Sequence, residues 1–318
     1  MLVIAEIGSN WKSLDTILRS IDMAKLCGAD AVKLQLYDHQ KLYGYRRRMA
    51  GCLEPHHVQH ASERARENGL KFILSVFDPN DVWEVRSHVD YIKIASSNSS
   101  DVLLLQSAAE CDRPIILSTG ASSISDIRRS LGTISSIRND DMDTTLMYCV
   151  SSYPSVENDL SVISLLRIEF GLPVGLSDHS LDVFNSPVIA KDVYGCSMIE
   201  KHFKISNMGT PDSGHSLGMH DFERMTRRLA SGMPREMPKC EGEEHMLLKN
   251  KVRLVAIDSI DPGDTFSYGK NFGIFRSKEP CEDPMSPYEW MSVDNAKCCG
   301  FLSIGDSIRR VHVEGLKD

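Results

Sequence analysis

Residues 2–36 read LVIAEIGSNWKSLDTILRSIDMAKLCGADAVKLQL, two short apolar runs on either side of an amphipathic stripe. The runs at 2–7 and 31–36 are apolar almost throughout, which is typical of strands buried on both faces of a parallel sheet. Between them, apolar residues recur at helical spacing, with Ser13 placed as an N-cap and Gly28 placed as a stop. The stretch therefore predicts a strand–helix–strand unit.

The same alternation continues over about the first 230 residues. We predict strands at 2–7, 31–36, 71–76, 90–95, 114–119, 144–149, 173–177 and 197–203, and helices at 14–24, 58–70, 103–110, 124–131, 163–171, 184–194 and 221–229. This number of strand–helix units favours the α/β class and a closed (β/α)8 (TIM) barrel over residues 1–232. An open doubly wound sheet is the alternative, although it usually has fewer strands per domain.

The composition changes after the barrel. Residues 233–250 are polar and proline-bearing, and we interpret them as a linker. Residues 251–318 contain short apolar stretches, a turn at 261–264 and a single short helical turn near 288–291. They predict a small β-rich module.

Composition and charge exclude several classes of protein. The chain has 318 residues, a net charge of −8 and a pI near 5.8, which argues against a nucleic-acid partner because phosphate backbones need a basic face. Nine cysteines without a CxxC pair indicate reduced thiols. No signal peptide is recognisable, and no apolar run approaches the ~20 residues that span a bilayer. We expect a cytoplasmic protein with no membrane partner.

Polar residues cluster at the carboxyl ends of the predicted strands, which is the face where a (β/α)8 barrel carries its active site. A charge inside an apolar strand is costly unless it is paired or coordinated. Several strands with this feature at one end indicate a shared ligand. These residues are Glu6, Lys33, Gln35, Ser75, Lys93, Ser96, Ser118, Thr119, Ser151, Tyr153, Ser177, Asp178, His179, Glu200, Lys201 and His202.

Two lysines suggest that the ligand is an anion. Lysine acts as a point charge toward phosphate and hydroxyl groups donate further hydrogen bonds. A phosphorylated ligand explains two cations and several hydroxyls better than a lone carboxylate does. The alternative is structural, since Glu6 could simply neutralise Lys33. The predicted cradle consists of Lys33, Lys93, Ser96, Ser118, Thr119 and Ser177.

Two histidines suggest a metal. His179 and His202 end consecutive strands, and neutral imidazoles suit Mn²⁺, Fe²⁺, Co²⁺ or Zn²⁺. From spacing alone, ordinary loop histidines remain an equal alternative. A second group, His56, His57 and His60, has helical spacing, but a solvated helix face explains it better than a metal site does.

Several motifs together resemble a known family, in this order along the chain: IAEIG (4–8), GADAVKLQ (28–35), YIKIASS (91–97), PIILSTG (114–120), YCVSSYP (148–154), PVGLSDHS (173–180), IEKHF (199–203) and PDSGHSL (211–217). The chain resembles N-acetylneuraminate (sialic acid) synthases and their relatives that make legionaminic, pseudaminic and spore-coat sugars. The resemblance covers about residues 2–230. It implies the condensation of phosphoenolpyruvate with an N-acyl hexosamine similar to N-acetylmannosamine, giving a sialic-acid-type sugar and phosphate.

The resemblance also implies roles for single residues. Glu6, His179 and His202 are the implied catalytic residues, and the two histidines hold a divalent metal, Mn²⁺ first, with Mg²⁺ or Co²⁺ as alternatives. Residues 251–318 resemble the antifreeze-like SAF domain, which offers an arginine across a domain-swapped homodimer. The implied phosphoenolpyruvate set is Lys33, Lys93, Ser96, Ser118, Ser151 and Ser177, and the implied sugar set is Gln35, Tyr153, Asp212 and Arg276.

The chain departs from the family pattern in four loops, at Trp11, Val76, Ser151 and Ser277. These changes leave the identity of the sugar open. Two rival hypotheses remain: a phosphosugar-using enzyme similar to a 3-deoxy-octulosonate phosphate synthase, and a catalytically impaired barrel that acts as a binding subunit.

Overall fold

The structure is a computed structural model that describes residues 1–37, 53–138, 143–155, 158–232 and 251–316. The chain divides near residue 233 into two compact units, and each is described by itself. The predicted linker at 233–250 lies outside the described residues.

The N-terminal unit is a closed barrel of eight parallel strands. Each strand pairs with the next along the chain, and the first also pairs with the eighth, from Leu2↔Met198 to Glu6↔His202. This closure confirms the barrel and shows that the open-sheet alternative is wrong. The strands are β1 (Leu2–Glu6), β2 (Ala31–Leu36), β3 (Lys71–Val76), β4 (Tyr91–Ile94), β5 (Ile115–Ser118), β6 (Thr144–Cys149), β7 (Val174–Asp178) and β8 (Met198–Lys204).

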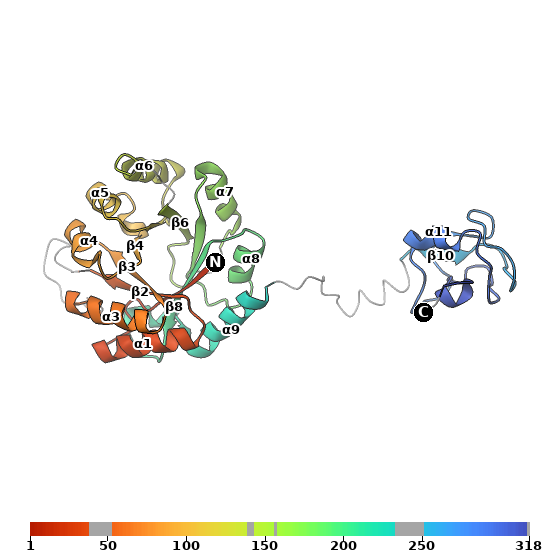
Figure 1. Ribbon diagram of the computed structural model, residues 1–318, viewed down its shortest axis with the longest axis horizontal. Coiled ribbons are helices and arrows are strands. Elements are labelled where there is room, and N and C mark those ends of the chain that lie inside the picture. The colour runs from red at the N-terminus through yellow and green to blue at the C-terminus, as the bar shows by residue number, and fades with distance from the viewer. Residues whose placement is uncertain (38–52, 139–142, 156–157, 233–250, 317–318) are drawn as a thin grey trace. The chain divides into compact units, whose positions relative to one another are not determined.

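Helices surround the strands as an outer ring (Figure 1). They are α1 (Leu14–Leu26), α3 (Pro55–Glu67), α4 (Pro79–Val85), α5 (Val102–Glu110), α6 (Ile124–Ser135), α7 (Ser161–Phe170), α8 (Ser186–Asp192) and α9 (Met219–Ser231).

Local signals place most of the helix ends. The Ser13 side chain accepts a hydrogen bond from the backbone of Thr16, which confirms the predicted N-cap of α1. Helix α3 begins three residues before its predicted start because Pro55 suits the first helical turn. The pattern did not predict α4, a helix of seven residues.

Both faces of the strands carry apolar residues, and the two faces pack against different parts of the barrel. Their outer faces pack against the helices in the main core. Their inner faces meet near the amino ends of the strands in a small apolar cluster, here called the apolar floor: Ile4, Ala31, Ile73, Ile116, Met147 and Met198. Side chains alternate along a strand, so the residue two positions after each floor residue also points inward, one layer nearer the carboxyl end. Those residues are Glu6, Lys33, Ser75, Ser118, Cys149 and Glu200.

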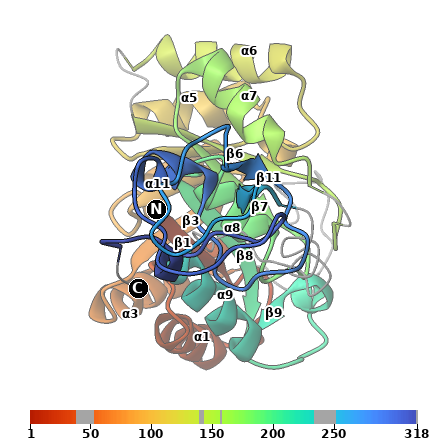
Figure 2. The same cartoon turned by 90° about the vertical axis from the view of Figure 1, so that its right-hand side faces the viewer.

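After β8 the chain forms the short helical turn η3 (Pro211–His215), the two-residue strand β9 (Leu217–Gly218) and then α9. The C-terminal unit pairs β10 (Arg253–Ala256) antiparallel with β11 (Phe272–Phe275) and has its own apolar core around Phe266 and Phe272 (Figure 2, blue). Its helical parts are η4 (Pro287–Glu289), α11 (Trp290–Val293) and η5 (Arg310–His312). The helical turn predicted near 288–291 corresponds to η4 and α11, and the SAF identity of the unit stays a prediction. Among the described residues, no helix is long and apolar enough to cross a membrane.

Candidate active site

A cavity of about 320 Å³ lies at the carboxyl end of the barrel, directly above the apolar floor. All eight barrel strands or the loops that follow them contribute to its wall. The lining residues are Glu6, Lys33, Gln35, Ser75, Phe77, Lys93, Ala95, Ser96, Ser97, Ser118, Cys149, Ser151, Tyr153, Ser177, His179, Glu200 and His202. A hollow of about 390 Å³ is lined instead by residues at the start of β3 and before β4 and β5, the end of a barrel that does not carry active sites.

The deepest layer of the cavity is an ionic network. The Lys33 ammonium lies 2.8 Å from Glu6 Oε2 and 3.7 Å from Glu200 Oε1. The Lys93 ammonium lies 2.8 Å from Glu200 Oε2. Ser75 accepts a hydrogen bond from Lys33, and Ser177 donates one to Glu200. All four charged side chains are buried. The pairing of Glu6 with Lys33 that sequence offered as an alternative therefore exists, but inside the cavity.

The two carboxyl groups of this network differ in proton affinity. Burial raises the pKa of Glu6 to about 7, opposed by Lys33 and reinforced by the Glu200 charge. Burial also acts to raise the pKa of Glu200, but Lys33 and Lys93 outweigh it and hold that pKa well below its usual range. Glu6 is therefore the group that can exchange a proton near neutral pH, while Glu200 stays ionised between two ammonium groups.

An aromatic cluster forms the side of the cavity next to β7 and β8. The His179 and His202 ring centroids are 5.7 Å apart, and Tyr153 stacks on His179 at 4.1 Å. Val150 O lies 2.7 Å from His179 Nδ1, and Ser177 Oγ lies 3.1 Å from Nε2. A carbonyl that accepts a hydrogen bond from one ring N–H orients a metal-binding histidine and leaves the other ring nitrogen with its lone pair.

His215 joins this cluster. Its ring centroid lies 4.5 Å from that of His202 and 4.8 Å from that of Tyr153. Burial is the main reason that the pKa of each of the three histidines is lowered, that of His202 most strongly. Their rings are therefore neutral at neutral pH, which is the form that binds metal ions.

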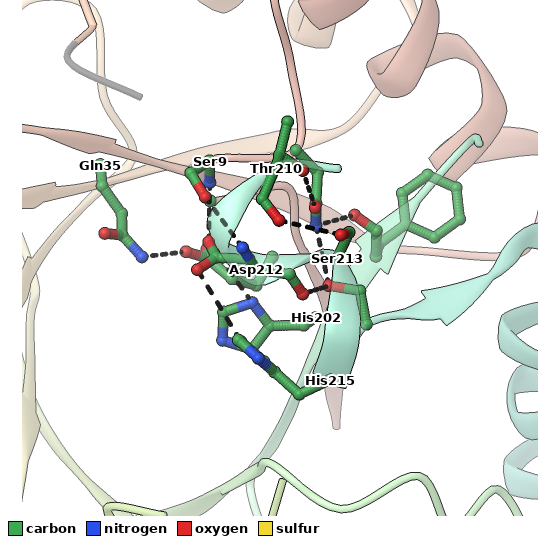
Figure 3. Close-up of polar contacts among 12 residues, drawn as sticks. Ser9, Gln35, His202, Thr210, Asp212, Ser213 and His215 are labelled. Carbon is green, nitrogen blue, oxygen red and sulfur yellow. Dashed lines mark hydrogen bonds and ion pairs between the residues drawn. The ribbon is translucent and has the colours of Figure 1, made fainter. Parts of the chain in front are cut away.

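Asp212 links the loop after β1 to the loop after β8. Its Oδ2 accepts a hydrogen bond of 2.7 Å from the Ser9 amide, and Ser9 Oγ accepts one from the Asp212 amide. Figure 3 shows Ser9, His202 and His215 gathered around Asp212. Gly8 makes this approach possible, because its φ is +53° and an added Cβ would lie 2.3 Å from Asp212 Oδ2.

The predicted ligand-binding residues lie in different parts of the structure. Gln35 donates a 2.7 Å hydrogen bond to Glu6 Oε1, and Tyr153 is exposed above the histidines. The predicted serines at 96, 118, 151 and 177 all line the cavity. Thr119 does not line it, because its hydroxyl donates to the Met147 carbonyl instead, so its predicted place in the cradle is wrong. Arg276 is exposed and directly follows β11 in the C-terminal unit.

Two residues of the site had no predicted role in the chemistry. Glu200 could have been found from strand alternation, since it lies two positions before His202 and points to the same face. His215 lies three positions after Asp212, a spacing that brings two side chains together only if the segment is helical. Lys201 points to the opposite face of β8, where it pairs at 2.7 Å with Asp178.

The second histidine group lies on helix α3. His56 and His60 are exposed on α3, and His57 is half-buried. Within the described part of the chain, they are not among the histidine and acidic residues close enough to share a metal. The exposure of His56 and His60 fits a solvated helix face, whereas the Nδ1 atom of His57 is buried.

Comparisons with known proteins show the family to which the chain belongs. The model of the NeuB family matches residues 20–232. The pseudaminic acid synthase of Helicobacter pylori is 28% identical, over 83% of this chain and 85% of that protein. The N,N'-diacetyllegionaminic acid synthase of Legionella pneumophila is 30% identical, over 76% and 74%.

Among solved structures, the N-acetylneuraminic acid synthetase of Leptospira borgpetersenii superposes with a TM-score of 0.68 at 26% identity, over 77% of this chain and 90% of that one. A spore coat polysaccharide biosynthesis protein of Bacillus subtilis, 24% identical, has the same fold with a TM-score of 0.67, over 100% and 96%. The chain therefore belongs to the NeuB family and is an enzyme of the synthase type found there.

Proposed function

We propose that the enzyme condenses phosphoenolpyruvate with an N-acyl amino sugar similar to N-acetylmannosamine, forming a nonulosonic acid and inorganic phosphate. The observation that carries the proposal is one cavity in which two buried ammonium groups lie beside neutral imidazoles. An anion and a carbonyl compound can meet there. The names of the pseudaminic and legionaminic acid synthases among the relatives support this reaction class.

Phosphoenolpyruvate would bind over Lys33 and Lys93. With Glu6 protonated, the network of two lysines and Glu200 carries a net positive charge, which favours an anion. An anion nearby would raise the proton affinity of Glu6 further, so binding and protonation reinforce each other. Hydroxyl groups around the cavity supply hydrogen bonds to the phosphate and carboxylate oxygens, from Ser96, Ser118, Ser151 and Ser177.

The acceptor sugar would bind where Gln35 and Tyr153 line the cavity, with Asp212 beside His202. The residues fit a divalent cation, because His202 has a buried ring nitrogen without a hydrogen-bond partner and His179 is oriented by the Val150 carbonyl. Mn²⁺ is our first expectation. Such a cation would polarise the aldehyde oxygen of the open-chain sugar and stabilise negative charge on it.

The bonds then change as follows. C3 of phosphoenolpyruvate attacks the aldehyde carbon, and the aldehyde oxygen takes up a proton. Glu6 is placed to supply that proton, because its pKa of about 7 keeps it partly protonated at neutral pH. Water adds at C2 of the former enol, and cleavage of the C2–O bond releases phosphate. Lys33 and Lys93 stabilise the charge on the departing group, and holding both reactants together can contribute on the order of 7–11 kcal/mol to the lowering of the barrier.

Phosphate release from phosphoenolpyruvate, with Mn²⁺ and a panel of N-acyl hexosamines and their 6-phosphates, tests the proposal. We expect release with an unphosphorylated sugar, because Lys33 and Lys93 are the cationic side chains in the described lining and both are assigned to phosphoenolpyruvate. Release only with a 6-phosphate would favour the phosphosugar-using alternative. Binding of phosphoenolpyruvate without release with any sugar would favour the binding subunit. Lys93→Ala should abolish release in every case.

The C-terminal unit enters this proposal through Arg276. We further expect this unit to be a SAF domain in a domain-swapped homodimer, with Arg276 reaching the sugar site of the partner. We also expect the enzyme to be cytoplasmic.

A further inference from the structure

His215 lies where a metal ligand would, although the histidine pattern of the sequence did not select it. Its Nε2 is 3.8 Å from Asp212 Oδ1, and His202 Nδ1 is 3.9 Å from Asp212 Oδ2. The two imidazole rings stand nearly perpendicular, with an interplanar angle of 79°. One ligand atom from each of the three residues lies within 4.8 Å of the others (Figure 3).

The same two ring nitrogens are buried and have no hydrogen-bond partner among the described residues: Nδ1 of His202 and Nε2 of His215. A buried polar atom without a partner destabilises the folded state. Both nitrogens face the Asp212 carboxylate, but from beyond hydrogen-bond distance. Each orphaned nitrogen therefore lies near one oxygen of the same carboxylate, with a space between nitrogen and oxygen that an ordinary hydrogen bond does not span.

A divalent cation fits that space. Ligand atoms about 2.0–2.2 Å from a common ion lie roughly 3–4.4 Å apart, which matches the two nitrogen–oxygen distances and requires only small rotations of the side chains. The donor set also suits such an ion. Two imidazoles and one carboxylate with open positions are a known ligand set for first-row transition metals.

We propose that His215 is a further protein ligand of the divalent cation in this chain, forming with His202 and Asp212 a centre that the predicted pair of His179 and His202 did not include. The inference rests on the proposed function for the role of the ion. Asp212, which sequence assigned to the sugar, then acts through the cation, and the carboxylate and the second imidazole would favour Mn²⁺, Fe²⁺ or Co²⁺ over Mg²⁺, because Mg²⁺ prefers an all-oxygen shell.

The test measures metal binding directly. The metal-stripped full chain is titrated with Mn²⁺ and followed by the loss of the free-ion paramagnetic resonance signal. The Co²⁺ form is examined by visible absorption. His215→Phe keeps an aromatic ring against Tyr153 but removes the nitrogens, and His215→Gln keeps a polar side chain. We expect both variants to weaken Mn²⁺ binding at least about 10-fold and to change the Co²⁺ spectrum. His220→Gln, on the exposed first turn of α9, is the control and should change neither.

The outcomes are separable. Unchanged Mn²⁺ affinity and an unchanged Co²⁺ spectrum in a folded His215→Phe variant would overturn the inference, because a ring that only packs on Tyr153 tolerates this exchange. Phosphate release is assayed on the same preparations. If the unaltered chain binds Mn²⁺ through His215 but releases no phosphate with any sugar, the proposed function is wrong and the metal centre stands. Circular dichroism melts identify a variant that fails to fold, in which case the other variant decides.

Discussion

At the scale of single residues, the site depends on close approaches that only particular side chains allow. Gly8 combines a left-handed backbone with contact to Asp212, and Glu6 combines full burial with a neighbouring ammonium group. In both cases the residue type follows from a physical constraint. The first constraint can be tested by adding a methyl group at Gly8, and the second by removing the charge of Glu6.

Gly8→Ala should lower the free energy of unfolding by more than the cost of a left-handed backbone alone. Any L-residue at a positive φ costs about 1–2 kcal/mol, and here the added methyl group would also collide with Asp212. Gly209→Ala is a matched control, because Gly209 has a φ of +64° and no neighbour within 4 Å of the added atom. Urea denaturation should show a cost of about 1–2 kcal/mol for the control and a larger one for Gly8→Ala, together with weaker Mn²⁺ binding. Equal effects in the two variants would mean that the contact with Asp212 is unimportant.

Glu6 should make the stability of the barrel depend on pH. Its folded pKa is about 7 and its ordinary value is 4.5, so the stabilisation is complete below about pH 4.5 and is lost as the pH rises through 7. The loss amounts to at most about 3 kcal/mol. Glu6→Gln should be relatively more stable at pH 8 than at pH 5, measured by urea denaturation, whereas exposed Glu84→Gln should follow the unaltered chain. Parallel curves for all three proteins would refute the assignment.

At the scale of elements, strand alternation explains how one barrel contains both a core and a site. On β8, Met198 belongs to the apolar floor, Glu200 to the ionic network and His202 to the histidine cluster, each two residues after the last. Residues between them point outward. Lys201 is such a residue, and its ammonium group also approaches the Asp182 carbonyl at 2.9 Å, in the loop after β7.

The buried pair of Lys201 and Asp178 should hold β7 and β8 in the geometry that the histidines need. Lys201→Met leaves a buried carboxylate without its cation, at a cost of about 3–5 kcal/mol. Adding Asp178→Asn should restore most of the stability, because the amide oxygen still accepts from Asn158 and the Ser180 amide.

Urea denaturation of the two variants, with Mn²⁺ affinity as a second readout, checks this expectation. Arg227→Met breaks an exposed pair with Glu223 and should change stability by less than about 1 kcal/mol. A double variant no more stable than Lys201→Met would show that the charge of Asp178 is not what makes the single change costly.

At the scale of the whole molecule, two units with separate cores share one chain. The described cavity lining comes from the barrel alone, while the predicted sugar-binding Arg276 belongs to the C-terminal unit. In a domain-swapped dimer the site and its arginine come from different copies. In such a dimer, an intact barrel site needs the arginine of the other copy.

Two inactive variants should therefore complement each other. Lys93→Ala disables the barrel, and Arg276→Ala disables the contribution of the C-terminal unit. When the two chains are co-expressed, random pairing leaves one intact site in each mixed dimer, so we expect at most about a quarter of the unaltered phosphate-release activity. Each variant expressed alone is the control. No recovery in the mixture, with mixed dimers demonstrated by differential tagging, would contradict an arginine acting across the dimer.

Much of the barrel and its site could be predicted because each strand carries its own signal. The eight apolar runs became eight strands, with ends shifted by at most one residue, and most of the charged residues at those ends line one cavity, although Asp178 and Lys201 do not. Helix α4 was missed because its seven residues stand alone, whereas the equally short α8 lies inside a longer helical pattern at 184–194. Thr119 was misplaced because a hydroxyl next to a strand end can equally donate to a backbone carbonyl.

By itself the sequence determined the barrel, its polar end and the family. The spacing of apolar residues and the position of polar residues at strand ends are local properties, so they can be recognised without knowing which residues are close in space. Tertiary structure decided which side chains pair with one another in the site. Only closure of β1 on β8 brings Glu200 between two lysines that are 107 and 167 residues away along the chain, and only the turn of η3 brings His215 to His202. Charge pairing and metal ligation depend on distances through space, and no periodicity along the chain encodes those distances.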